Sequence, residues 1–191
     1  DREQFEILRR IEMAEEATVR VLLPLKVRPT TKLEEIADAA QWANEAQGEF
    51  IRTGVVKFLL DGVIEGGTAC LLDDYANMPG KRGELNYSIE QFNQMVAEVD
   101  RSKMQVAVHA IGDASVRTAL DSFEKLVRTY GRRDRRHRIE HIELIHPDDI
   151  VRFVRLDVTA SFQPLHVPTV IRDDDPWVAA IGQERLVNAM P

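Results

Sequence analysis

His109 and His141 each close a short apolar run and are the residues of this chain best placed to do chemistry. The runs 105–109 and 137–141 have the composition of β-strands, and the stretch between them has a helical pattern. The two histidines are therefore one strand-helix-strand unit apart, and successive parallel strands bring such residues to the same carboxyl-terminal rim of a sheet. Because neutral imidazole is the commonest protein ligand for zinc and related metals, the pair predicts a metal site.

The composition is that of a folded domain whose main partner is not a polyanion. The 191 residues are 44% hydrophobic and 30% charged, and the formal net charge is −7. This balance allows a buried core, and the acidic excess argues against nucleic acid or an anionic membrane as partner. No apolar run approaches the roughly 18 residues that a membrane span needs. The single cysteine, Cys70, excludes an internal disulfide framework and is compatible with the cytoplasmic location that we expect.

Strand and helix patterns alternate along the chain, which predicts an α/β fold with a parallel sheet. The expected strands are 18–25, 54–60, 105–109, 137–141 and 157–163. Helices are expected near the start of the chain, after capping boxes at Thr31 and Ser88, after Asp113 and from Pro147. The basic run 132–136 lies between a helix and a strand, where a solvated loop is favoured over a phosphate-binding patch.

Polar residues recur on one side of the expected strands, which favours a β/α barrel over an open sheet. His109 shares a side of its strand with Gln105, and Ser161 shares a side with Thr159 and Gln163. Polar side chains toward the interior and apolar ones toward the helices are what a barrel with an interior site requires. An open doubly wound sheet needs apolar residues on both faces.

Lys57 stands alone among the apolar residues of its strand, and the alternation turns it inward. A buried lysine is costly unless it pairs, shifts its pKa or is chemically modified. Two interpretations stay open. In one, the amine reaches solvent at the strand end or pairs with Asp61. In the other, carbon dioxide carboxylates the amine and gives a carboxylate that can bridge two metal ions.

Several short blocks along the chain carry a family resemblance. They are Val56-Lys57-Phe58 with 61–62 and 66–69, then HAIGD at 109–113, RIEH at 138–141 and SFQPLH at 161–166. In order and spacing these blocks resemble amidohydrolase family 3, a group of metal-dependent hydrolases that includes N-substituted formamide deformylases. The resemblance runs from about Thr18 to the end of the chain, and HAIGD followed by RIEH is its specific part.

The resemblance implies a (β/α)8 TIM barrel with one or two divalent ions, usually zinc. Lys57 matches a strand lysine that is carboxylated in many such enzymes, and His109 and His141 match metal ligands on the next two strands. The implied reaction is attack of a metal-bound hydroxide on a small amide or formamide-type substrate, since coordination lowers the pKa of water to about 7.

Parts of the family pattern are absent from this chain. It contains neither the His-x-His pair of the first strand nor the aspartate that accepts a proton after the eighth, and 173–175 lie too early to replace it. The catalytic base is therefore unknown. The five expected strands match family strands three to seven, so we expect residues 1–191 to be one partial barrel domain truncated at both ends. Two hypotheses remain: a fragment of a hydrolase of carbon-nitrogen bonds, or a non-catalytic barrel piece that self-associates as a homo-oligomer through its open sheet edges.

Other polar residues have supporting roles in this prediction. Asp61 and Asp113 are expected behind the metal ligands, with Asp113 more suited to capping a helix than to catalysis. His166 and Gln163 follow the last strand and are candidates for the substrate pocket, because functional residues of barrels gather at that end. Glu140 is expected to pair with an arginine of the helix layer.

His137 begins its strand, which puts it at the opposite end of the sheet from the predicted site. His146 precedes Pro147 at the start of a helix and is expected to be structural. These two histidines are therefore not predicted metal ligands.

Overall fold

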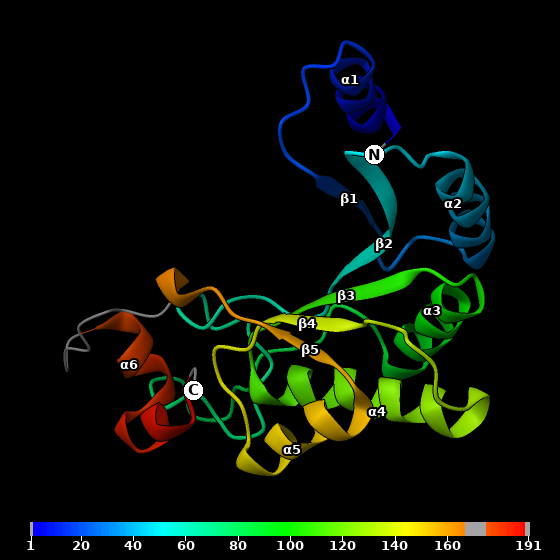
Figure 1. The fold of residues 1–191 in the computed structure, drawn as a ribbon. Helices are drawn as coiled ribbons and strands as arrows, with labels where there is room; N and C mark the ends of the chain where they lie inside the picture. The colour runs from blue at the N-terminus through cyan, green and yellow to red at the C-terminus, as the bar shows by residue number, and fades with distance from the viewer. Residues whose placement is uncertain (1, 167–174, 190–191) are drawn as a thin grey trace.

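A single parallel sheet forms the centre of the molecule in the computed structural model, which describes residues 2–166 and 175–189 (Figure 1). Its strands are β1 (Val21–Lys26), β2 (Ile51–Leu59), β3 (Gln105–Ala110), β4 (Arg138–His141) and β5 (Thr159–Ser161). They lie side by side in sequence order, and every neighbouring pair is parallel. The predicted α/β architecture and the sequential strand order are confirmed.

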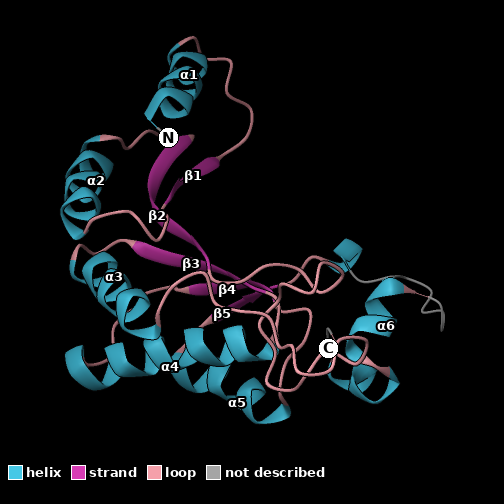
Figure 2. Cartoon of the chain, turned by 180° about the vertical axis from the view of Figure 1, so that it is seen from behind, coloured by secondary structure: helices cyan, strands magenta, loops and turns pink. Residues whose placement is uncertain are grey.

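Helices cover one face of the sheet and leave the other face open (Figure 2). The covering helices are α2 (Leu33–Glu45), α3 (Ile89–Arg101), α4 (Asp113–Tyr130) and α5 (Pro147–Leu156). Outside this layer lie α1 (Arg2–Met13), α6 (Pro176–Ile181) and the 3-10 turns η1 (Pro164–His166) and η2 (Gln183–Asn188). No helix within the described ranges is long and apolar enough to cross a membrane.

The main core lies between the sheet and this helix layer, as the alternation of side chains predicts. Val56, Phe58, Val106 and Val108 turn toward the helices and are at most 1% exposed. Phe58 packs edge-to-face on Phe92 of α3, with ring centroids 5.3 Å apart. The apolar side chains of the strands thus pack against the helices, and the polar side chains of the same strands lie on the open inner face.

A second, smaller core joins the long loop after β2 to α6. Ile64, Leu71 and Tyr75 of the loop pack with Trp177 and Ile181. The loop is also tied by its backbone, since the amide of Ala76 donates to the carbonyl of Ala180 at 2.8 Å. This core lies beside the carboxyl ends of the strands and holds the loop against them (Figure 1).

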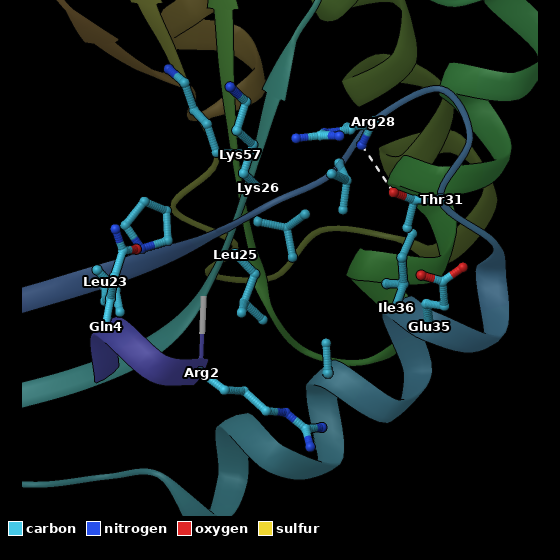
Figure 3. A pocket seen from close by; sticks show the side chains of 14 residues that line it. Arg2, Gln4, Leu23, Leu25, Lys26, Arg28, Thr31, Glu35, Ile36 and Lys57 are labelled. Carbon is cyan, nitrogen blue, oxygen red and sulfur yellow. Dashed lines mark hydrogen bonds between the residues drawn. The ribbon is translucent and has the colours of Figure 1, made fainter. Parts of the chain in front are cut away.

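Two local predictions differ in detail from the structure. The cap of α2 is one residue later than predicted, because Glu35 rather than Glu34 accepts from the amide of Lys32, at 3.1 Å. The Thr31 hydroxyl instead accepts from the amide of Arg28 at 3.0 Å (Figure 3). Strand β5 is only three residues long, shorter than the predicted 157–163, and it has one neighbour, β4.

Candidate metal centre

The carboxyl ends of β3 and β4 bring His109 and His141 into contact. Ala110 is the register partner of His141, and the two imidazole rings lie 4.6 Å apart at 68°. A third imidazole, that of His166, stacks on His141 with centroids 4.9 Å apart and ring planes 12° apart. The structure therefore brings together the two predicted ligands and one predicted substrate-pocket residue.

The backbone of His141 explains how two neighbouring residues of β4 reach the same face. His141 and Ile142 have φ angles of +80° and +53°, in the left-handed region that non-glycine residues rarely adopt. This turn interrupts the strand alternation, so that Glu140 and His141 both lie on the inner side. Strained backbone of this kind persists where the surroundings hold it, often at functional sites.

Glu140 pairs with Lys57 across the inner face of the sheet. It also accepts from Arg138 Nε at 2.8 Å, and Arg138 belongs to the same strand. The predicted pairing of Glu140 with a helix-layer arginine is wrong, because its carboxylate lies on the other side of the sheet. The suggested pairing of Lys57 with Asp61 is also wrong, because Lys57 pairs with Glu140 and the Asp61 carboxylate accepts hydrogen bonds from other groups.

Lys57 lies beside a second lysine that the sequence reasoning did not include. Lys26 of β1 is its register partner, and the two side chains extend in the same direction (Figure 3). Burial, followed by the charges of Arg138 and Lys26, lowers the pKa of Lys57 to about 8. The Glu140 carboxylate acts in the opposite direction and favours the charged amine. An amine must be neutral to react with carbon dioxide, so these neighbours set how readily Lys57 could be carboxylated.

Asp61 is a buried acceptor that fixes the end of β3. Its carboxylate accepts four hydrogen bonds at 2.7–3.1 Å, from the amides of Cys70, Ile111 and Gly112 and from the Ser115 hydroxyl. Its Oδ1 lies 3.5 Å from His109 Nε2. Burial raises the pKa of Asp61, and the four donors oppose that shift. Asp61 thus holds the long loop, the end of β3 and the start of α4 together behind His109.

Asp113 has a similar anchoring role. It is the first residue of α4, one position after the cap residue Gly112, and accepts from the amides of Leu72 at 2.9 Å and Ala114 at 3.0 Å. The predicted cap role of Asp113 is therefore wrong by one residue, because Gly112 is the cap, and the Asp113 carboxylate instead holds the loop at Leu72.

Hydrogen bonding fixes which nitrogen of His109 is free. Its Nε2 lies 3.0 Å from the carbonyl oxygen of Gly62. Because a carbonyl only accepts, Nε2 carries a proton, and in the neutral ring Nδ1 keeps its lone pair. A bond of this kind to one nitrogen orients the other for a metal. Gly62 also borders a cavity of about 830 Å³, which is lined in addition by Gly67, Lys81 and Asn86.

His141 has a buried nitrogen without a partner. Its Nδ1 makes no hydrogen bond with any residue that the structure describes, although buried polar atoms are normally paired. Burial and the charges of His109 and Lys57 lower the pKa of His141 to about 4, so the ring is neutral at pH 7. A neutral imidazole with an unused nitrogen fits a metal ligand. Within the described ranges, however, no three His, Cys, Asp or Glu side chains are grouped closely enough to hold an ion by themselves.

The side chains after β5 meet a glutamate that the sequence reasoning missed. His166 Nδ1 lies 2.9 Å from Glu143 Oε1, and Glu143 Oε2 accepts from the Trp177 indole at 3.3 Å. Gln163 donates to Ser161 Oγ at 3.4 Å, and its own Oε1 is buried with no hydrogen-bond partner in the described part of the chain. The available signal for Glu143 was a lone charge within the otherwise apolar run 142–145.

A cavity of about 670 Å³ opens at the free edge of β1 (Figure 3). Leu25 and Ile36 form part of its apolar wall, Arg2 of α1 lies at its rim, and Lys57 also lines it. Of the three predicted metal ligands, this cavity therefore reaches Lys57 and not the two histidines.

Solved structures identify the class of fold. A metal-dependent hydrolase from Pyrococcus furiosus matches with a TM-score of 0.74 and 27% identity, covering 96% of this chain and 36% of that one. One from Pyrococcus horikoshii OT3 matches with a TM-score of 0.73 and 24% identity, covering 95% and 34%. The fold is thus that of the metal-dependent hydrolases, a TIM-barrel-type superfamily, represented here by five parallel strands.

The chain belongs to the amidohydrolase family, whose model matches residues 1–191. It is 32% identical over 160 residues to Protein LONG AFTER FAR-RED 3 of Arabidopsis thaliana, covering 84% of this chain and 27% of that protein. It is 29% identical over 156 residues to the putative amidohydrolase YtcJ of Bacillus subtilis (strain 168), covering 81% and 28%. The chain therefore spans little more than a quarter of the length of these relatives.

Proposed function

We propose that this chain supplies part of the metal centre of a hydrolase that cleaves carbon-nitrogen bonds in small amide or formamide-type molecules. The observation that carries the proposal is the contact between His109 and His141 at the carboxyl end of the sheet, with a buried and unpartnered nitrogen on His141. Membership of the amidohydrolase family and the likeness to metal-dependent hydrolases support the same class of chemistry.

In this proposal His109, His141 and Lys57 hold one or two divalent ions, with zinc the best match to two imidazole ligands. When bound, such an ion acidifies a water molecule and polarises the carbonyl that the water attacks. Carboxylation of Lys57 would give this set an oxygen ligand. Carboxylation requires the Lys57 amine to break its ion pair with Glu140. The strength of that ion pair therefore decides whether Lys57 can become a metal ligand.

The remaining residues orient these side chains. The Gly62 carbonyl and Asp61 keep the Nε2 proton of His109 away from the ligand position, and burial keeps His141 neutral. Gln163 and His166 stand beside His141 and are proposed to contact the substrate. No residue of the described part is assigned as the proton acceptor of the reaction.

A second candidate is a non-catalytic barrel piece that associates with itself. The observation in its favour is that, among the described strands, β1 and β5 each pair on one side only. Unpaired strand edges present backbone donors and acceptors to other chains. Sedimentation of the 191-residue chain distinguishes the candidates, because self-association that persists with unchanged zinc content in ligand variants favours the second.

Zinc titration followed by calorimetry tests the first candidate directly. His109→Ala and His141→Ala are each expected to weaken binding by more than the roughly 10–100-fold loss that follows removal of a group merely supporting a ligand. His146→Asn is the matched control, since His146 caps α5 and is not a proposed ligand, and asparagine retains the capping acceptor. Zinc affinity that is equal in all four proteins would refute the ligand assignment.

Turnover should depend on more than these 191 residues. We expect the isolated chain to show no appreciable hydrolysis of N-substituted formamides or simple amides in zinc, because it lacks the first-strand ligands and the proton acceptor. Loss of a general base alone lowers a rate by about 10²–10⁴-fold. A longer protein carrying the flanking strands is the comparator, and equal turnover by both would show that the catalytic groups are misassigned.

A further inference from the structure

The cavity of about 670 Å³ at the free edge of β1 lies between that strand, the start of α1 and the first turns of α2 (Figure 3). Leu25 of β1 and Ile36 of α2 belong to its apolar wall. Sites for small molecules have volumes of about 300–1,000 Å³ and combine apolar walls with a few polar groups. The volume and the lining of this cavity therefore suit a small molecule with an apolar body.

The charged side chains that line the cavity are mostly cationic, although the formal net charge of the chain is −7. Lys26 and Arg28 lie at one end of the cavity and Arg2 lies at the other (Figure 3). None of these three forms an ion pair with another described residue, whereas the fourth cation, Lys57, pairs with Glu140. The cavity thus collects positive charge that the described part of the chain does not neutralise.

One carboxylate, that of Glu35, also lines the cavity, and it has another role. It accepts from the amide of Lys32 at 3.1 Å and so caps the start of α2. It forms no ion pair with any of the cations of the cavity among the described residues. Three unpaired cations against one carboxylate leave a net positive lining, which favours an anionic ligand.

We infer that this cavity binds a small organic acid, with its carboxylate at Lys26 and Arg28 and its apolar body between Leu25 and Ile36. The planar guanidinium of arginine can donate two parallel hydrogen bonds to a carboxylate, and lysine adds a point charge. This inference goes beyond the proposed hydrolase chemistry and does not depend on it, because neither Lys26 nor Arg28 is a proposed metal ligand.

The free edge of β1 gives the cavity a competing occupant, a strand of a second copy of the chain. Among the described strands, β1 pairs only with β2, and an unpaired edge can accept another strand. A strand added to an edge gains its affinity mainly from backbone hydrogen bonds, which do not need cationic side chains. The unpaired charges of Lys26 and Arg28 therefore favour the organic acid over the strand.

Methyl NMR of the 191-residue chain, titrated with hexanoate in metal-depleted buffer, tests the inference. Without metal, a carboxylate cannot bind by ligating an ion. We expect saturable movement of the Leu25 and Ile36 methyl signals, with weaker binding at high salt. Acetate should bind at least about tenfold more weakly, because it lacks the apolar chain. The neutral 1-hexanol should also bind more weakly than hexanoate, because it lacks the charge.

Charge variants locate the carboxylate. Lys26→Gln and Arg28→Gln should each weaken hexanoate binding by about 2–5-fold, the usual range for a partly exposed ion pair, and the double variant should weaken it further. Binding of 1-hexanol should be unchanged, which shows that the cavity is still formed in each variant. Lys125→Gln is the matched control, because Lys125 is an exposed lysine of α4 that does not line the cavity.

Equal affinity of the wild type for hexanoate and 1-hexanol would overturn the inference, and this comparison needs no variant. Unchanged hexanoate affinity in the double variant would overturn it as well. Absent hexanoate binding in a chain that sediments as a dimer would overturn it in favour of a second copy at the β1 edge. Zinc titration of the His109 and His141 variants reports on the proposed function separately, so the two ideas can fail independently.

Discussion

The two ends of the sheet use histidine in opposite ways. At the amino end of β4, His137 is 2% exposed, accepts from the amide of Val106 at 3.1 Å and faces Asp100 Oδ1 at 3.5 Å. At the carboxyl end, His141 has a left-handed backbone, and its buried Nδ1 makes no hydrogen bond with a described residue. His137 Nε2 is likewise without a hydrogen bond in the described part, but it faces the Asp100 carboxylate, whereas His141 Nδ1 has no such acidic neighbour among the described ion pairs. The contacts of His137 therefore stabilise the fold, whereas the fold leaves a nitrogen of His141 available to a ligand.

The charged residues at the two ends of the sheet differ in the same way as the histidines. At the amino end, Asp100 accepts from both Arg133 and Arg135. At the carboxyl end, Lys26 and Lys57 lie side by side with only Glu140 opposite Lys57. In barrels of this type the amino-terminal face serves stability and the carboxyl-terminal face serves chemistry. The difference predicts that equivalent substitutions destabilise the amino end far more than the carboxyl end.

The largest effect is expected from Asp100→Ala. It leaves two guanidinium groups without their shared carboxylate and His137 without its neighbour. Removing one partner of a buried ion pair typically costs about 3–5 kcal/mol, because the remaining charge is uncompensated. Urea unfolding followed by circular dichroism measures the loss. A loss below about 1 kcal/mol would contradict the view that this end is built for stability.

His137→Ala should destabilise the chain by about 2–3 kcal/mol, since it opens a space in a buried layer and leaves the Val106 amide unpaired. His137 also packs on Phe123 of α4, with centroids 5.0 Å apart, and this contact is lost as well. The same urea experiment applies, with His146→Asn, at a side chain that is 39% exposed, as the matched histidine control. Equal stability of the two variants would argue against a structural role for His137.

Sequence patterns were sufficient for the strand order and for bringing His109 and His141 to the same end of the sheet, because both follow from hydrophobic periodicity and the rules of parallel sheets. They were insufficient for the directions of Glu140 and His141, because a left-handed turn at His141, which a non-glycine sequence does not indicate, leaves both side chains on the inner face. Glu143 was missed because its partners, His166 and Trp177, become neighbours only when α6 packs against the long loop. Contacts that depend on tertiary packing of distant segments leave little local signal.

Lowering the pH should destabilise the amino end of the sheet, because it protonates Asp100. Burial alone would raise the pKa of this carboxyl, but His137, Arg135 and Arg133 outweigh burial and hold the pKa well below its usual range. The stabilisation is therefore complete above the unfolded pKa of about 4 and is lost as pH falls through the folded pKa, at up to about 1.4 kcal/mol per pH unit. Unfolding of wild type and Asp100→Asn at several pH values checks this. The gap between them should narrow below pH 4, and a constant gap would exclude Asp100 as the source.

The smallest change in stability is expected at the other end of β4, from His141→Ala. The substitution removes ring contacts with His109 and His166, worth about 0.5 kcal/mol, and also removes a buried nitrogen that has no partner. These terms oppose one another, so the free energy of unfolding should change by less than about 0.5 kcal/mol. His141→Gly sharpens the test, because glycine adopts a φ of +80° without the steric penalty that alanine keeps. The glycine variant should be at least as stable as the alanine variant, measured without metal in the same urea series. A loss of 2 kcal/mol or more in both would show that His141, like His137, serves the fold, and the contrast between the two ends of the sheet would fail.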